Sequence, residues 1–294
     1  MEKYGRESEN PKKGRVEVEF WGTRGSCPAP FSNRMGYGGN TSCISVSWEE
    51  GLAVFDGGTG ILSLGRQMEK RGRWDIPIHI FIGHLHLDHI AGLILFPGLF
   101  QKDARIHLYG PPSEEESFQT RLSKVLGPPY WPVSVSQVPA RVIWHDGGDG
   151  DSWELPGGGL VRAISANHPN GGLLYRLEKE GRSVVYGMDC ELGAEDGLEY
   201  WEQYKRFARD CDLLLFDAPY TQEEYPDFLG FGHSYWEQGI RMAEACRAKR
   251  LCICHHNWDR EDEALKKAEP ELAQQLEKSG GKAWFAREGD RITL

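Results

Sequence analysis

Residues 83 to 89 read Gly83-His84-Leu85-His86-Leu87-Asp88-His89. Four of these seven side chains belong to types that bind metal ions, three imidazoles and one carboxylate. They directly follow Ile76 to Ile82, an apolar and β-branched run that is typical of a buried strand. A loop at the end of such a strand can turn several side chains toward one point. Because imidazole and carboxylate are the usual ligands of zinc and similar divalent ions, this segment predicts a metal site.

Helix and strand patterns alternate on both sides of this segment. Strand patterns occupy Val16 to Trp21, Cys43 to Trp48, Leu52 to Phe55, Arg141 to Trp144, Leu160 to Ala166, Gly172 to Leu177, Ser183 to Gly187, Leu213 to Phe216, Leu251 to Cys254 and a short stretch near the end. Helix patterns occupy Gly60 to Arg71, the start of Ala91 to Phe100, Glu114 to Leu126, Leu198 to Arg209, Tyr235 to Ala248 and a final region that Pro270 should kink or split. This alternation predicts a mixed α/β architecture.

Residues 15–294 are expected to form one domain, preceded by a flexible tail over residues 1–14, which are charged and polar. Residues near 111–139 are expected to form a surface loop or lid, because residues 127–133, Gly-Pro-Pro-Tyr-Trp-Pro-Val, suit neither a regular helix nor a central strand. Tyr130, Trp131 and Pro132 either form a pocket wall that stacks on a nucleobase or simply pin this loop. The sequence favours neither alternative.

The chain carries a formal net charge of −10 at pH 7. Proteins that hold nucleic acid by many phosphate contacts gather Lys and Arg on one face, so non-specific DNA or RNA binding is not expected. Seven scattered cysteines do not suggest a disulfide framework, which favours a reducing compartment. No apolar stretch is long enough to span a bilayer, and the first residues lack an apolar signal segment. We therefore expect a cytoplasmic protein with no membrane partner.

The segment 83–89 resembles the HxHxDH signature of the metallo-β-lactamase superfamily, which this chain matches at every fixed position. Later landmarks occur in the order of that family, each at or after the end of a predicted strand. They are His168 in Ala-Asn-His-Pro, Asp189 in Tyr-Gly-Met-Asp and His255 in Leu-Cys-Ile-Cys-His. The resemblance covers essentially residues 15–294 and implies an αββα four-layer sandwich with metals at one edge of its two sheets.

The resemblance also implies a centre of two divalent metal ions, with zinc in first place and manganese or iron as alternatives. Carried over position by position, it assigns His84, His86 and His168 to one ion, Asp88, His89 and His255 to the other, and Asp189 to both as a bridge. Asp88 counts as a catalytic residue as well. We prefer His255 to the neighbouring His256 because His255 directly follows the strand pattern. Histidines away from the motifs are expected to be ordinary strand or loop residues, namely His79, His107 and His145.

Further motifs resemble the branch of ribonuclease Z and cyclic-nucleotide phosphodiesterases. They are Trp-Gly-Thr-Arg-Gly-Ser at 21–26, Gly-Gly-Asn-Thr-Ser at 38–42, Asp-Gly-Gly-Thr-Gly at 56–60 and Gly-His-Ser-Tyr-Trp-Glu at 232–237. Asp56 is a candidate for orienting a ligand histidine. His233 is the candidate general acid that protonates the leaving alkoxide. Ser234 and Glu237 have the spacing of a capping box, which predicts that Ser234 caps the following helix.

The resemblance implies a hydrolase with metal-bound hydroxide as nucleophile. A small phosphodiester such as a cyclic nucleotide is favoured over transfer RNA, since the acidic chain has no basic arm. No stable nucleic-acid partner is expected, and a homodimer is expected from the resemblance alone. A carboxylic ester, thioester or lactone is the alternative substrate. A di-iron oxidoreductase is disfavoured because His86 stands where those proteins carry a carboxylate, and a non-catalytic binding module because no ligand position is missing.

Overall fold

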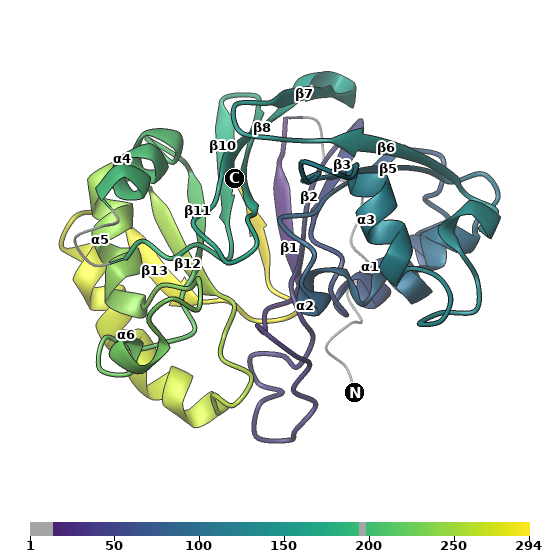
Figure 1. The fold of residues 1–294 in the computed structure, drawn as a ribbon. Coiled ribbons are helices and arrows are strands. Elements are labelled where there is room, and N and C mark those ends of the chain that lie inside the picture. The colour runs from purple at the N-terminus through teal and green to yellow at the C-terminus, as the bar shows by residue number, and fades with distance from the viewer. Residues whose placement is uncertain (1–13, 194–197) are drawn as a thin grey trace.

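Two seven-stranded mixed sheets face each other in the middle of the molecule, with helices on both outer sides (Figure 1). The structure is a computed structural model that describes residues 14–193 and 198–294. The tail predicted over residues 1–14 therefore lies outside the described residues, apart from Gly14. Over the described part of the chain, the helices are all too short or too polar to cross a membrane.

The first sheet has the strand order β14-β1-β2-β3-β4-β5-β6. Its strands are β1 (Glu17–Gly22), β2 (Cys43–Trp48), β3 (Gly51–Phe55), β4 (Ile78–Phe81), β5 (Arg105–Gly110), β6 (Arg141–Asp146) and β14 (Arg291–Thr293). β1 to β3 pair antiparallel, as expected for strands joined by tight turns, and β3 to β6 pair in parallel. The last strand of the chain, β14, pairs antiparallel with β1.

The second sheet has the strand order β13-β12-β11-β10-β9-β8-β7. Its strands are β7 (Ser152–Leu155), β8 (Gly159–Ser165), β9 (Leu173–Lys179), β10 (Arg182–Gly187), β11 (Leu213–Asp217), β12 (Arg250–Cys254) and β13 (Lys282–Phe285). β7 to β10 pair antiparallel, and β10 to β13 pair in parallel. Each sheet thus has an antiparallel part and a parallel part.

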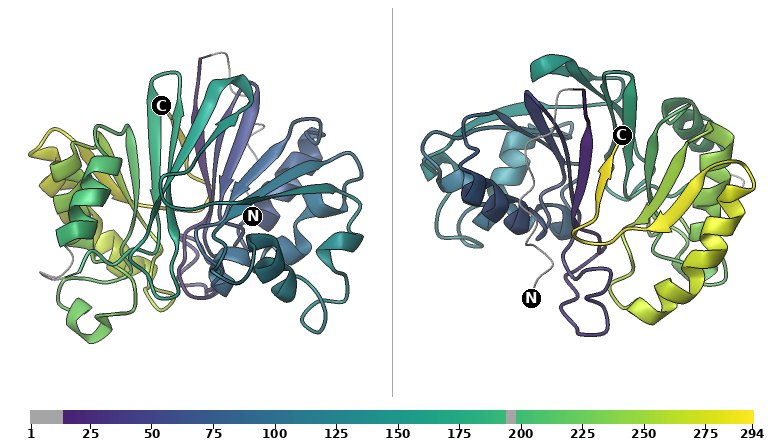
Figure 2. Two further views of the ribbon diagram at one scale, coloured as in Figure 1. Left: turned by 45° about the horizontal axis from the view of Figure 1, so that its top comes forward. Right: turned by 180° about the vertical axis from the view of Figure 1, so that it is seen from behind.

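Three layers of apolar side chains separate four layers of backbone. One buried cluster joins the inner faces of the two sheets, and two others lie between a sheet and its helices. The helices are α1 (Ile61–Arg71), α2 (Leu87–Ile90) and α3 (Phe118–Val125) beside the first sheet, and α4 (Leu198–Phe207), α5 (Trp236–Cys246) and α6 (Asp262–Glu277) beside the second (Figures 1 and 2). The expected αββα four-layer sandwich is confirmed.

The parallel strands of both sheets end at the same edge of the sandwich. Asp56 directly follows β3, His255 directly follows β12, and Asp189 lies two residues after β10. All three have a left-handed backbone, with φ of 61°, 59° and 53° respectively. A left-handed backbone costs a residue with a side chain on the order of 1–3 kcal/mol. Such conformations cluster at functional sites, so this edge is where a site is expected.

Several predicted elements differ in detail. Strands β5 and β7 were not predicted. The four residues of β7 carry little apolar signal, since only Leu155 among them is fully buried. Residues 91–100 form two 3₁₀ helices, Leu93–Leu95 and Pro97–Phe100, instead of the start of an α-helix, since Pro97 cannot continue an α-helical pattern. α6 is one helix that contains Pro270. Pro270 is exposed, so water can solvate the carbonyl that the proline leaves without a donor.

Residues 111–139 contain α3 and a 3₁₀ helix at Val135–Gln137, joined by an irregular stretch. Ser117 caps α3 by accepting a hydrogen bond from the Thr120 N–H. The role of this region as a lid stays a prediction.

Candidate metal centre

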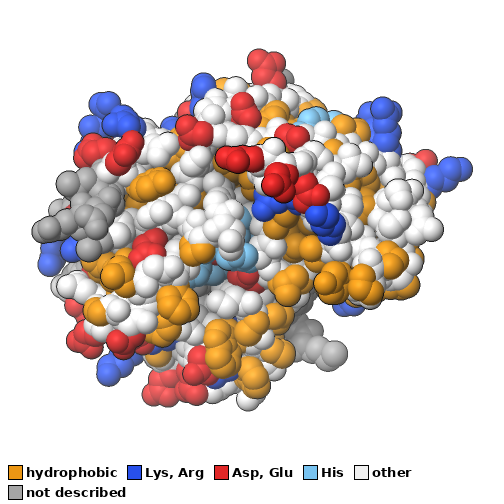
Figure 3. Space-filling view, viewed as in Figure 1, with side chains coloured by type: hydrophobic (Ala, Val, Ile, Leu, Met, Phe, Trp, Pro, Cys, Tyr) orange, Lys and Arg blue, Asp and Glu red, His pale blue; other side chains and the backbone are white. Residues whose placement is uncertain are grey.

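Histidine and aspartate side chains from both sheets converge at the edge where the parallel strands end. They form three overlapping groups, and within each group one ligand atom per residue lies within 4.8 Å of the others. The groups are His84, His86, His168 and Asp189; Asp88, His89, Asp189 and His255; and Asp189, Asp217, His233 and His255. The seven ligands predicted from the sequence are the members of the first two groups. Figure 3 shows histidine side chains near the middle of this face of the molecule.

The first group surrounds one carboxylate oxygen of Asp189. Nε2 of His84 lies 3.5 Å from Asp189 Oδ2, and Nε2 of His168 lies 3.7 Å from the same oxygen. His168 Nε2 is also 3.2 Å from Nδ1 of His86. Three imidazole nitrogens and one carboxylate oxygen therefore face a common point.

The second group surrounds the other oxygen of Asp189. His89 Nε2 lies 3.3 Å from Asp189 Oδ1, and His255 Nε2 lies 3.1 Å from it. The same two nitrogens are 3.2 Å and 3.1 Å from Oδ2 of Asp88. Asp189 thus directs one oxygen to each group, which is the arrangement a bridging carboxylate needs.

Several of these atoms are buried and have no hydrogen-bond partner in the described part of the chain. They include Nε2 of His84, Nε2 of His89 and Oδ1 of Asp189. An unsatisfied buried polar atom costs about 1–3 kcal/mol, more if it is charged. Imidazole nitrogens and carboxylate oxygens that face each other without hydrogen-bond partners fit a divalent cation, which accepts the lone pairs of all of them at once. The residues present therefore fit a metal centre.

Hydrogen bonds behind the cluster fix the orientation of its rings. Asp56 accepts from His89 Nδ1 at 2.5 Å, and the same carboxylate accepts from the Gly83 N–H at 2.7 Å and from the Tyr186 hydroxyl at 2.6 Å. His168 Nδ1 donates to the carbonyl of Gly232 at 2.9 Å. A donor bond from Nδ1 leaves Nε2 as the lone-pair nitrogen that faces the cluster. Asp56 therefore contacts a histidine of the motif, as the sequence suggested.

The loop after β1 closes the second group from outside. The Ser26 N–H donates to Asp88 Oδ2 at 2.7 Å. Gly25 lies so close to the cluster that a Cβ there would be 2.3 Å from Nδ1 of His255. Only glycine fits at this point of the sequence motif Trp-Gly-Thr-Arg-Gly-Ser.

Asp217 is a member of the cluster that the sequence analysis missed. It ends β11, is almost fully buried, and accepts from Nδ1 of His233 at 2.9 Å. Its other oxygen lies 3.3 Å from Nδ1 of His255. The sequence did carry a signal for Asp217, because this carboxylate ends an apolar strand pattern, much as the histidine motif follows one.

His233 lies beside the metal-binding groups and is paired with Asp217. Burial by itself would lower the pKa of His233, but the carboxylates of Asp217 and Asp189 outweigh burial and raise the pKa. Burial raises the pKa of Asp217, whereas His233 and His255 lower it, and the net direction is down. Because Nδ1 is bonded to Asp217, Nε2 of His233 is the nitrogen left to exchange a proton with a bound molecule.

The predicted capping box at Ser234 and Glu237 is wrong. Helix α5 has Tyr235 as its N-cap and no side-chain cap bond. The Ser234 hydroxyl instead donates to the Cys190 carbonyl at 2.7 Å and accepts from the Leu192 N–H at 3.3 Å. The hydroxyl of Ser234 therefore bonds to the segment after Asp189 instead of capping its own helix. These two bonds fix the position of Ser234, the residue that follows His233.

The structure separates the neighbours His255 and His256. The ring of His255 lies in the second group, whereas Nε2 of His256 is 2.8 Å from the Ala286 carbonyl, on the other side of the strand end. His256 instead makes edge contacts with Tyr37 and Phe285.

The remaining histidines lie away from the cluster, in strands of the first sheet, where their rings stack. They are His79, His107 and His145.

Aromatic rings reach the cluster from the segment between β11 and α5. Tyr220 packs edge-on against His233 at 6.2 Å and stacks on Phe228 at 4.2 Å. Phe231 contacts Phe228 at 5.8 Å and is 60% exposed. Tyr130, in the predicted lid, is 73% exposed, and its role as a pocket wall stays a prediction.

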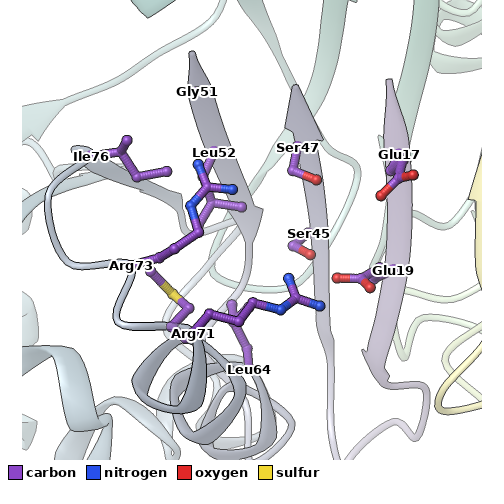
Figure 4. Close-up of a pocket in the computed structure, with 11 residues that line it drawn as sticks. Glu17, Glu19, Ser45, Ser47, Gly51, Leu52, Leu64, Arg71, Arg73 and Ile76 are labelled. Carbon is purple, nitrogen blue, oxygen red and sulfur yellow. The ribbon is translucent and has the colours of Figure 1, made fainter. Parts of the chain in front are cut away.

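A separate small pocket lies on the outer face of the first sheet and carries both signs of charge (Figure 4). Glu17 and Glu19 of β1 face it from one side and Arg71 and Arg73 from the other. Glu19 is paired with Arg291 of the neighbouring strand. The pocket has a volume of about 30 Å³, which is room for roughly two water molecules. It is too small for an organic substrate.

Comparisons with known proteins agree on the fold. A family model described as "Beta-lactamase superfamily domain" matches residues 54–256. The ribonuclease Z of Myxococcus xanthus is 23% identical over 286 residues, which cover 82% of this chain and 86% of that protein. The metallo-β-lactamase fold protein YhfI from Bacillus subtilis superimposes with a TM-score of 0.69 at 17% identity, covering 95% of this chain and 100% of that one. A diphosphatase of the PhnP family has a TM-score of 0.67 at 20% identity, covering 95% and 97%.

Proposed function

The chain belongs to the metallo-β-lactamase superfamily and is a metal-dependent hydrolase, and we propose that it hydrolyses a phosphodiester at a dinuclear metal centre. The observation that carries this proposal is the pair His233–Asp217, which lies beside Asp189 in the same cluster as the ligand groups. A phosphodiester releases an alkoxide, which is a poor leaving group unless a proton reaches it. A histidine next to the metal-binding residues supplies that proton.

The two ions would be held by the first two groups. His84, His86 and His168 would bind one ion, Asp88, His89 and His255 the other, and Asp189 both. Divalent ions bound there supply charge stabilisation for phosphoryl oxygens and lower the pKa of a water molecule. Zinc fits a set dominated by imidazole, and manganese and iron are the alternatives.

His233 acts as the general acid in this proposal. Its Nδ1–H is held by Asp217, so the ring keeps one orientation and one tautomer while Nε2 gives its proton to the leaving oxygen. Asp217 stabilises the charged ring before the transfer. Asp88 is not the proton donor in this proposal. Its Oδ2 accepts a hydrogen bond from the Ser26 N–H and faces His89 and His255, so its role is to bind the metal ion.

We favour a small phosphodiester, such as a cyclic nucleotide, as the substrate. The net charge of −10 argues against a protein surface that grips a long polyanion. RNA is a second candidate, because a relative that is similar to this chain over most of its length is named ribonuclease Z. Tyr220 packs against His233, Phe228 stacks on Tyr220, and the exposed Phe231 contacts Phe228. This aromatic cluster supports a substrate with a planar base, since any base can stack on an exposed ring.

A hydrolysis panel tests the proposal. Bis(p-nitrophenyl) phosphate, cyclic nucleotides, a precursor transfer RNA, a thioester and a lactone are compared, with zinc and manganese supplied separately. We expect metal-dependent turnover of the phosphodiesters, and of the small ones in preference to RNA. Efficient cleavage of the RNA alone would make RNA the substrate, and turnover of the thioester or lactone without any phosphodiester would reject the proposal. Sedimentation analysis of the same preparation checks the expected homodimer.

A further inference from the structure

Glu191 is a buried carboxylate that the metal-binding and proton-transfer roles do not use. It lies two residues after Asp189 and is 7% exposed. Its side chain accepts three hydrogen bonds from one segment, residues 225–232. The donors are the Tyr225 hydroxyl at 2.7 Å, the Gly230 N–H at 2.9 Å and the Gly232 N–H at 2.9 Å. Hydrogen bonds to an ionised carboxylate are roughly twice as strong as neutral ones, so Glu191 holds this segment firmly.

The backbone of Glu191 is tied to the residue before His168. Its N–H donates to the Asn167 carbonyl at 2.8 Å, and the Asn167 side-chain amide donates back to the Glu191 carbonyl at 2.8 Å. Glu191 therefore connects three segments of the site: the one that carries Asp189, the one that carries His168, and residues 225–232, which lead to His233.

Gly232 transmits this constraint to the ring of His168. Its carbonyl accepts from His168 Nδ1 at 2.9 Å, and its N–H is one of the three donors to Glu191. Its φ is 87°, and a Cβ at this position would lie 2.1 Å from His168 Nδ1. The backbone of Gly232 thus touches the imidazole directly, and a shift of this residue must move or release the ring.

We propose that Glu191 is a positioning residue for the metal centre. It holds residues 225–232 so that the Gly232 carbonyl keeps His168 with Nε2 toward Asp189, and so that His233, the next residue, stays beside Asp217. This inference rests on the proposed function, because it takes the group of His84, His86 and His168 to bind a metal ion. Glu191 itself contacts neither the ion nor the substrate.

The test is the substitution Glu191→Gln. The amide has nearly the same shape, but it removes the charge and turns an NH₂ group toward a backbone N–H that needs an acceptor. Loss of a hydrogen bond made directly to a metal-binding histidine lowers metal affinity by about 10- to 100-fold. Glu191 acts on His168 through Gly232, so a loss of about 10-fold is expected. We expect that loss for the zinc ion held by His84, His86 and His168, measured by competition with a chelating dye, together with an altered absorption spectrum of the cobalt-substituted protein.

Asp212 provides the matched control. It is also a buried carboxylate of the second sheet that accepts a backbone N–H, that of Ser183 at 2.9 Å, and it binds Lys249 at 2.8 Å. Asp212→Asn should lower the melting temperature without changing zinc affinity or the cobalt spectrum. If Glu191→Gln folds poorly, Tyr225→Phe removes one of the three donors and should weaken zinc binding in the same direction, by less.

The outcomes separate this inference from the proposed function. A wild-type protein that binds no divalent ion would overturn both. A wild-type protein that binds two zinc ions, together with a Glu191→Gln variant that binds both with unchanged affinity and spectrum, would overturn the positioning role alone. Equal losses of zinc affinity in Glu191→Gln and Asp212→Asn would also overturn it, because the effect would then come from general destabilisation.

Discussion

Asp189 is the residue on which the contacts of the site converge. One of its oxygens faces His84 and His168, and the other faces His89 and His255. Its left-handed backbone, with φ of 53°, costs free energy, and such conformations cluster at functional sites.

Replacement of Asp189 by Ala should therefore lower metal content and activity together. Elemental analysis of the purified variant measures the first effect, and hydrolysis of bis(p-nitrophenyl) phosphate the second. Asp103→Ala, at an exposed aspartate distant from Asp189 in the sequence, serves as the control and should change neither metal content nor activity. Two bound metals and normal turnover in Asp189→Ala would show that this carboxylate is not the bridge.

His233 gives a second prediction at the same scale. His233→Ala should reduce kcat by about 100- to 10,000-fold for a diester with an alkoxide leaving group, because the general acid is lost. p-Nitrophenolate hardly needs a proton, so its release should slow much less. Asp217→Asn should show the same dependence on the leaving group, more weakly, since the ring stays but loses its charged partner. An equal slowing of both leaving groups in His233→Ala would assign the residue a structural role.

The loop between β1 and β2 is the element that covers the site. Arg24 is fully buried in it and donates to four carbonyls, those of Arg34 at 2.9 Å, Gly38 at 2.7 Å, Asn257 at 3.1 Å and Arg260 at 2.7 Å. Burial lowers the pKa of Arg24 to about 10, with Asp262 acting in the opposite direction. Arg24 thus fastens this loop to the segment after β12, which begins with His255.

Arg24→Ala should lower the free energy of unfolding by about 3–5 kcal/mol, because it leaves four carbonyl partners of the buried guanidinium without their donor. Urea denaturation measures the change. Arg24→Lys should recover little of it, since an ammonium group cannot reproduce the planar set of donors. Arg209→Ala, at an exposed arginine, should leave the denaturation midpoint unchanged. A midpoint unchanged in Arg24→Ala would mean that the loop does not depend on this residue.

At the scale of the whole molecule, the site joins the two sheets. His84, His86, Asp88 and His89 follow β4 of the first sheet, whereas His168, Asp189 and His255 follow strands of the second. Each proposed ion would therefore be held from both sides of the sandwich, and metal binding should stabilise the fold as a whole.

Removal of metal by a chelator should lower the melting temperature by roughly 5 °C or more, because a ligand at 100 times its Kd stabilises the folded state by about 2.7 kcal/mol. Differential scanning calorimetry measures the shift, and adding zinc back should reverse it. The Asp189→Ala variant should show no such shift, which separates loss of bound metal from other effects of the chelator. A melting temperature of the wild type that does not respond to chelation would contradict the predicted link between metal and fold.

The sequence by itself determined the fold class and the members of the histidine motif. His84, His86, Asp88 and His89 lie within one short loop, so their proximity follows from chain connectivity. The alternation of apolar strand and helix patterns likewise predicted a mixed α/β architecture, and the family resemblance implied the αββα sandwich. Local spacing carries this kind of information because neighbours in the chain stay neighbours in space.

Only the tertiary structure decided the contacts between distant residues that neither a motif nor the family resemblance implied. Asp217 joins His233 across 16 positions of the chain, and Glu191 reaches Gly232 across 41. Ser234 also shows that a local pattern can mislead, since its spacing predicted a helix cap but its hydroxyl donates to the carbonyl of Cys190 instead. The sequence favoured His255 over His256, and the turn of the chain after β12 is what places the ring of His255, and not that of His256, in the cluster. Such pairings depend on how whole sheets pack, and side-chain packing between distant segments is not encoded in the spacing of any one motif.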